Sequence, residues 1–267
     1  PERDVVLEER NSRIGNDPSA RLSEAMDAAF YKNHPYRFPV IGWEHEIRQL
    51  NRMDALNFYN KFYTPENAIL IVAGDVVPAD VYELAQATYG TVPRNGEALP
   101  RLRPVEPPVE TALTVTLSDE QVKQPSVRRS FLVPSYNSAE GKDGYALDML
   151  AEILGGGSTS RLYTELVLND GPATAAGSWY QGTQLDSGSF SFYAVPKGDE
   201  ELQELIEKVQ AVADAIKTEG VSQSELDAAR NRMIADTVYA QDNQASLARI
   251  IGVGLMTGLS LEDIQSW

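Results

Sequence analysis

The chain has 267 residues, of which 42% are apolar and 23% charged, and it is long enough for one large domain or two of ordinary size. With 39 acidic and 23 basic side chains its net charge is −16, which argues against nucleic acid or an anionic membrane as a partner. Cysteine is absent, so disulfides and thiolate metal sites are excluded, and the compartment stays open: periplasm or cytoplasm for a bacterial protein.

The first 92 residues are predicted to be mostly helical. Helices are expected over 1–14, from Asp17 to about 30, over 52–63 and over 78–89, with Asp17 as N-cap and Pro18 in the first helical position. The aromatic and proline-rich segment 33–47 is predicted to be a packed loop. The apolar run 67–76, which contains Gly-Asp near its end, is typical of a buried strand. No apolar run is long enough to predict a membrane-spanning helix.

A proline-rich stretch divides the sequence. Five prolines stand among charged residues between Val92 and Glu110, at positions 93, 100, 104, 107 and 108. Such a composition is typical of an extended linker between domains. The prediction is therefore one domain over 1–92, a linker over 93–110 and a second domain over 111–267.

The second half places strands before helices. Strands are expected over 111–117 and 127–135, an antiparallel pair over 173–182 and 188–196, and helices over 144–157, 159–169, 199–219 and 222–240. Ser260 is a candidate N-cap for a short final helix, with Asp263 three residues on. This order favours an α+β sandwich over an alternating parallel sheet.

Two carboxylates lie in line with apolar residues near the start of the chain. In a helix, Glu2 and Glu9 are two turns apart on one face, with Val5 and Val6 between them. Local spacing alone favours solvated side chains, with Glu9 paired to Arg13 at i+4.

Several motifs then follow one another in a familiar order. They are "ERDVVLEE" at 2–9, "HPYRFPVIG" at 34–42, "FYTPENAILIVAGDV" at 62–76, the proline linker, and "LDMLAEILGGGSTSRLYTEL" at 147–166. In order and spacing the whole chain resembles the insulinase/pitrilysin-like zinc peptidases, the family M16 that includes mitochondrial processing peptidase.

The resemblance implies two similar α+β domains, with antiparallel-rich sheets packed by helices as in the LuxS/processing-peptidase-like metalloproteases. On that template the chain is the back half of the first domain, which is incomplete, and most of the second. The zinc motif His-x-x-Glu-His is expected upstream, because the only histidines are His34 and His45 and neither has the spacing. From their surroundings, His34 is interpreted as a loop-packing residue and His45 as a surface residue.

The resemblance also assigns roles to the carboxylates. Glu9 matches the third zinc ligand, and Glu2 matches a second acidic position that supports the site by orienting a ligand. Glu8, adjacent but off the stripe, is the weaker alternative to Glu9. The implied reaction is metal-assisted hydrolysis of peptides or unfolded polypeptides, with Zn²⁺ in the intact protein. This chain alone is expected to be inactive and to hold no zinc tightly.

The sequence departs from the family pattern in the second domain. Catalytically complete members carry an Arg and a Tyr, seven residues apart, that bind substrate backbone and stabilise the tetrahedral intermediate. Aligned through Gly171, these substrate-binding positions are Val167 and Thr174 here, and neither donates like Arg or Tyr. Arg161 belongs to the earlier "SRL" position, where we expect a structural role that holds the helix to the glycine loop.

Two functions follow from this pattern. Glu9 favours the zinc-bearing partner of a two-subunit peptidase, paired with a homologous two-domain subunit as a hetero- or homodimer. Val167 and Thr174 favour the alternative, a non-catalytic structural subunit of the same family. The Gly155–Ser160 run lacks the lysine of a phosphate loop, so it is interpreted as a helix stop that allows close backbone packing.

Overall fold

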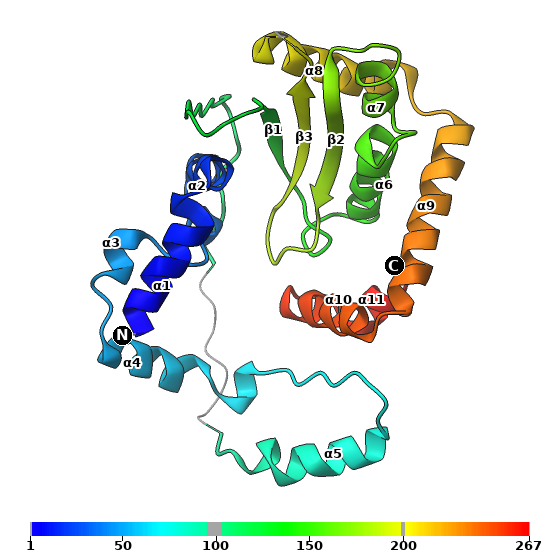
Figure 1. Ribbon diagram of the computed structural model, residues 1–267. Helices are drawn as coiled ribbons and strands as arrows, with labels where there is room; N and C mark the ends of the chain where they lie inside the picture. The colour runs from blue at the N-terminus through cyan, green and yellow to red at the C-terminus, as the bar shows by residue number, and fades with distance from the viewer. Residues whose placement is uncertain (1, 95–102, 199–200, 267) are drawn as a thin grey trace. The chain divides into compact units, whose positions relative to one another are not determined.

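The computed structural model describes residues 2–94, 103–198 and 201–266. Contacts between Cα atoms divide the chain into two compact units (Figure 1). The first unit is Pro1–Leu70 with Asp75–Lys123, and the second is Ile71–Gly74 with Gln124–Trp267. The described parts of the predicted linker, 93–94 and 103–110, have no helix or strand and are assigned to the first unit. The predicted domain limits at 93–110 stay a prediction.

Among the described residues of the first unit, all regular secondary structure is helical. Its elements are α1 (Glu2–Arg10), the π-helical turn η1 (Asn11–Gly15), α2 (Pro18–Phe30), η2 (Pro35–Arg37), α3 (Glu44–Ile47), α4 (Arg52–Phe62), η3 (Pro65–Asn67), α5 (Pro78–Ala87) and η4 (Tyr89–Thr91). The four predicted helices of this half are confirmed, although the first is π-helical beyond Arg10. Asp17 caps α2 as predicted, because its carboxylate accepts the Ser19 N–H at 2.8 Å.

Part of the predicted loop at 33–47 is helical. Most of it is irregular or a single 3₁₀ turn, but α3 forms one α-helical turn there. The buried Ile47 explains this turn, because its side chain gains an apolar environment when the backbone closes the helix. The expectation of a wholly non-helical loop was therefore wrong at its last four residues.

Two predicted strands, 67–76 and 111–117, are not strands in the structure. Ile69, Leu70 and Val72 each stay about half exposed, so the first run is not buried either. A strand forms only where a neighbouring strand completes its hydrogen bonds. Among the described residues the strands pair only with one another in the second unit, so neither apolar run has a partner.

The second unit is a small antiparallel sheet packed by helices (Figure 1). Its elements are β1 (Val127–Val133), α6 (Asp143–Gly155), α7 (Arg161–Leu166), β2 (Ala173–Gln181), β3 (Gly188–Pro196), α8 (Leu202–Glu219), α9 (Gln223–Gln241), α10 (Gln244–Met256) and α11 (Leu261–Ser266). The strand order is β1-β3-β2, with Phe190 of β3 opposite both Phe131 and Tyr180. The α+β class and the predicted β2–β3 pair are confirmed.

The core of the second unit lies between the sheet and three helices. Alternate residues of β3 (Phe190, Phe192 and Ala194) are buried, as expected for one covered face of a strand. They pack with buried residues of α6 (Ala151, Leu154), α7 (Leu162, Leu166) and α8 (Leu205, Ile206, Val209). Burial of this apolar surface is the main force that holds the helices on the sheet.

The close contact between the end of α6 and β2 requires glycine at position 155. A side chain at Gly155 would overlap the backbone of Ser178 in β2. The Ser178 hydroxyl donates to the Ala151 carbonyl at 2.9 Å, so helix and strand lie in direct backbone contact. The predicted close packing at this glycine stop is confirmed. No helix in the described ranges is both long and apolar enough to cross a lipid bilayer.

Candidate functional site

Glu2 and Glu9 lie on one exposed face of α1. Both side chains are exposed, and Val5 between them is exposed as well, so this stripe is not part of a core. The Glu9 carboxylate forms an ion pair with Arg13 at 2.8 Å, as its spacing alone predicted, and the Glu9 side chain remains 42% exposed. Exposed pairs of this kind contribute little to stability and exchange readily.

Arg10 fixes the orientation of α1. Its guanidinium donates to both Glu24 oxygens on α2 at 2.7 Å and to the Gly42 carbonyl at 2.9 Å. The hydrogen bond to Glu24 raises the pKa of Arg10, and both side chains are largely buried. The helix is therefore held through Arg10 while the neighbouring Glu9 points into solvent. The π-helical turn η1 follows at once, and such turns are frequent at functional sites.

The described residues do not by themselves fit a zinc ion. No group of three or more His, Cys, Asp or Glu side chains in the described ranges is placed to hold a metal. His34 is buried against the ring of Tyr36, with ring centroids 4.1 Å apart, and its Nδ1 accepts the Tyr36 N–H. His45 is exposed on α3. Zinc in proteins needs three or four ligands, so the described part of the chain offers at most part of a site.

The substrate-binding positions flank the junction of α7 and β2. Val167 caps the end of α7 and is half-buried against the hydrophobic core. Thr174 lies at the register shift between Ala173 and Ala175, which leaves its side chain exposed beside the regular ladder. Bulges of this kind redirect single side chains and are frequent near active sites.

The turn between these positions is tightly built. Asn169 and Asp170 adopt positive φ angles of 53° and 66°, a conformation that Asn and Asp tolerate better than most residues. The Lys197 ammonium pairs with Asp170, and the Lys197 N–H donates to the Pro172 carbonyl at 2.9 Å. The Thr174 hydroxyl accepts from Gln124 Nε2 at 3.0 Å.

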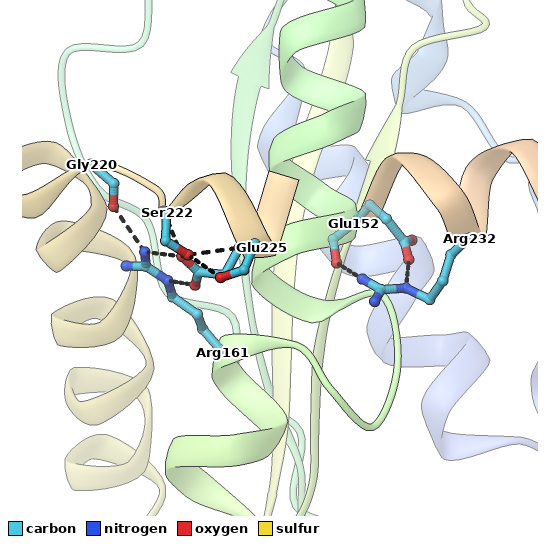
Figure 2. A network of polar contacts seen from close by, with 7 residues as sticks. Glu152, Arg161, Gly220, Ser222, Glu225 and Arg232 are labelled. Carbon is cyan, nitrogen blue, oxygen red and sulfur yellow. Dashed lines mark hydrogen bonds and ion pairs between the residues drawn. The ribbon is translucent and has the colours of Figure 1, made fainter. Parts of the chain in front are cut away.

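Two arginines, Arg161 of α7 and Arg232 of α9, hold these helices and the glycine loop (residues 155–160) in place (Figure 2). Arg161 donates to both Glu225 oxygens, at 2.5 and 2.9 Å, and to the Gly220 carbonyl at 2.8 Å. Glu225 also accepts the Ser222 N–H at 2.8 Å and so closes the capping box of α9. The hydrogen bond from Arg161, partly opposed by burial, lowers the pKa of Glu225 to about 2. Arg161 therefore ties the start of α7 to the start of α9.

The glycine loop is held by a different residue from the one predicted. Arg232 of α9 pairs with the Glu152 carboxylate and donates to the Glu152 carbonyl at 3.2 Å (Figure 2). Arg232 also donates to Thr159 Oγ1 at 2.9 Å. The role expected for Arg161 thus belongs to Arg232. Sequence spacing gave no signal for it, because Arg232 and Glu152 are 80 residues apart in the chain.

A protein-family model described as the peptidase M16 inactive domain matches residues 49–233, more than half of the chain. The chain belongs to the peptidase M16 family. The family predicted from the sequence motifs is confirmed. Within this M16 chain the matched stretch contains Val167 and Thr174, whereas Glu2 and Glu9 precede it.

Relatives of this M16 chain are named as zinc proteases. It is 30% identical to the zinc protease PqqE of Helicobacter pylori over 250 residues, which are 93% of this chain and 55% of that protein. It is 28% identical to an uncharacterized zinc protease of Mycobacterium tuberculosis over 257 residues, 93% of this chain and 56% of that protein. The chain thus spans about half the length of the curated relatives it matches.

A solved structure shares the fold along the whole chain. The crystal structure of a protease from Helicobacter pylori superposes with a TM-score of 0.84 at 29% identity. The match covers 100% of this chain and 63% of that one. The arrangement of a small antiparallel sheet packed by helices is therefore that of an M16-like peptidase.

Proposed function

We propose that this chain is part of a zinc-dependent endopeptidase subunit that hydrolyses peptides or unfolded polypeptides, and that it is the zinc-bearing partner of a two-subunit peptidase. The observation that carries the proposal is Glu9, an exposed carboxylate on a helix held by Arg10, in a chain whose relatives are named zinc proteases. In the proposed subunit, residues 1–92 complete the first domain, 93–110 form the linker and 111–267 belong to the second domain.

Glu9 is suited to the role of a single carboxylate ligand. Its present partner is Arg13 in an exposed i,i+4 pair, which is worth only about 0.3–0.5 kcal/mol and so is readily given up. Glu2, two turns away on the same face, would support the site by orienting a ligand. We propose that the remaining ligands come from outside this chain, because the described residues contain no group of three or more His, Cys, Asp or Glu side chains placed to hold a metal.

The second unit supports the assignment to a two-subunit enzyme. Val167 has no side-chain donor, and the Thr174 hydroxyl is engaged with Gln124 and, at 3.4 Å, with the Val195 carbonyl. Neither residue is equipped to stabilise a developing oxyanion. We propose that a homologous two-domain subunit supplies the Arg and Tyr that this chain lacks.

The test is a mixing experiment with the intact subunit, meaning this chain together with the remainder that its relatives contain. The zinc-loaded subunit alone should be about 10²–10³ times slower on an unstructured peptide than the mixture with a homologous subunit that carries the Arg/Tyr pair, because losing one oxyanion donor costs that much.

The second part of the experiment restores the Arg/Tyr pair in the same chain. Val167→Arg with Thr174→Tyr should recover part of the rate, whereas Leu168→Arg with Thr174→Tyr, which places the guanidinium one position away, should not. A zinc-loaded subunit that is fully active alone would contradict the two-subunit assignment. A subunit that binds no zinc under any condition would instead favour the non-catalytic structural role. The presence of Val167 and Thr174 at the Arg/Tyr positions is the feature that favours this role.

A further inference from the structure

Glu106 binds three consecutive backbone amides of the first unit. Its carboxylate accepts the N–H of Lys32 at 2.6 Å, of Asn33 at 2.9 Å and of His34 at 2.7 Å. Beside it, Asn33 Nδ2 donates to the Val105 carbonyl at 3.2 Å. The amides lie just beyond the end of α2, in a turn that aims them at one point, and converging amides of this kind bind anions.

The carboxylate is held in its charged form. Burial opposes ionisation of Glu106, but the three backbone hydrogen bonds outweigh it and lower the pKa. Hydrogen bonds to a charged acceptor are about twice as strong as those between neutral groups. Glu106 is therefore a strong attachment point at neutral pH.

A second attachment lies further along the same segment. The Asp119 carboxylate pairs with Arg21 of α2 at 2.5 Å and accepts the Gln121 N–H at 2.8 Å. Between the two attachments the backbone is neither helix nor strand. Val105 is 85% exposed and Leu113 is 62% exposed, so apolar burial contributes little to holding the segment near Glu106.

We propose that residues 103–119, here called the strap, are a latched arm of the first unit and that Glu106 is the latch. The division of contacts agrees with this, because it assigns 75–123 to the first unit. Regular structure resumes at Val127, where β1 begins. Release of Glu106 would free the part of the strap that precedes Asp119, while the Asp119–Arg21 ion pair still holds the far end of the strap to α2.

Limited digestion of this chain with an endoproteinase that cuts after glutamate tests the proposal. The Glu110–Thr111 bond lies inside the strap and the Glu120–Gln121 bond lies beyond it, so their cleavage ratio reports strap release within one sample. Glu106→Ala should raise the ratio of cleavage at Glu110 to cleavage at Glu120 by at least about tenfold. Loss of even one hydrogen bond to a charged group changes a local opening equilibrium by that factor. Glu83→Ala, on the exposed face of α5, should leave the ratio unchanged.

An unchanged ratio in Glu106→Ala would overturn the latch. If Glu106→Ala also becomes cleavable at Glu24 within α2, the first unit itself has loosened. The native chain is then compared with the more conservative variant Glu106→Gln. Hydrogen exchange of the Lys32, Asn33 and His34 amides is then the readout. Faster exchange of these amides with α2 still protected supports the latch, whereas unchanged exchange overturns it.

Discussion

At the scale of single residues, Gly155 shows the clearest steric constraint. A methyl group there would overlap the Ser178 backbone in β2, and backbone cannot move aside as a flexible side chain can. Gly155→Ala should therefore lower the free energy of unfolding by about 1–3 kcal/mol or more, as overpacking does. The midpoint of urea unfolding measures this.

Gly252→Ala is the matched control for that substitution. Gly252 lies inside α10, where an added methyl would meet only the end of the flexible Ile71 side chain, at 3.1 Å. Alanine also favours a helix over glycine by about 0.5–1 kcal/mol. The control should leave the unfolding midpoint nearly unchanged or raise it slightly. Equal losses in both variants would show that the contact at Ser178 is not the cause.

Residue-level prediction from the sequence worked where the signal was local. The Glu9–Arg13 pair follows from i,i+4 spacing, and the close packing at Gly155 follows from the glycine run. The partnership of Arg232 with Glu152 could not be predicted, because the two residues meet only after α9 has packed on α6. The roles of Glu2, Glu9, Val167 and Thr174 stay predictions.

At the scale of elements, the Arg161–Glu225 ion pair joins α7 to α9. The folded pKa of Glu225 is about 2, below its usual value of 4.5, so the carboxylate stabilises the fold above about pH 4.5. That stabilisation should be lost as the pH falls from about 4.5 to 2. Glu225→Gln should lower the free energy of unfolding at pH 7 by about 1.5–3 kcal/mol and remove this part of the acid dependence.

An exposed ion pair on the same helix supplies the comparison. Asp227 pairs with Arg230 at 2.8 Å on the surface of α9, and Asp227→Asn should change the stability little. Unfolding monitored by circular dichroism between pH 7 and 2.5 distinguishes the two variants. If Glu225→Gln keeps the full acid dependence of the native chain, another carboxylate is responsible for it.

Elements with local start and stop signals were predictable, and elements that need a distant partner were not. Helix α2 begins at a capping Asp17 followed by Pro18, and β2 with β3 alternates around a short turn. The runs 67–76 and 111–117 have strand-like composition but no strand beside them in the described structure. Composition states what a segment can form, whereas pairing depends on the rest of the fold.

At the scale of the whole molecule, the candidate residues are divided between the two units. Glu2 and Glu9 belong to the first unit, and Val167 and Thr174 to the second. The family and the α+β fold were both predictable, because motifs along the full length of the chain keep the family order. The zinc role was not demonstrable from this chain, since a single carboxylate does not define a metal site.

The most direct test of the zinc assignment is the metal content of the intact subunit after single substitutions. Glu9→Gln should lose zinc, because it replaces a charged ligand with a weak neutral one, whereas Glu8→Gln, one position away on α1, should keep both zinc and rate. Glu2→Gln should keep most of the zinc and lose about 10–100-fold in rate, as changes to supporting residues do. Full zinc content in Glu9→Gln, or equal zinc loss in all three variants, would contradict the account.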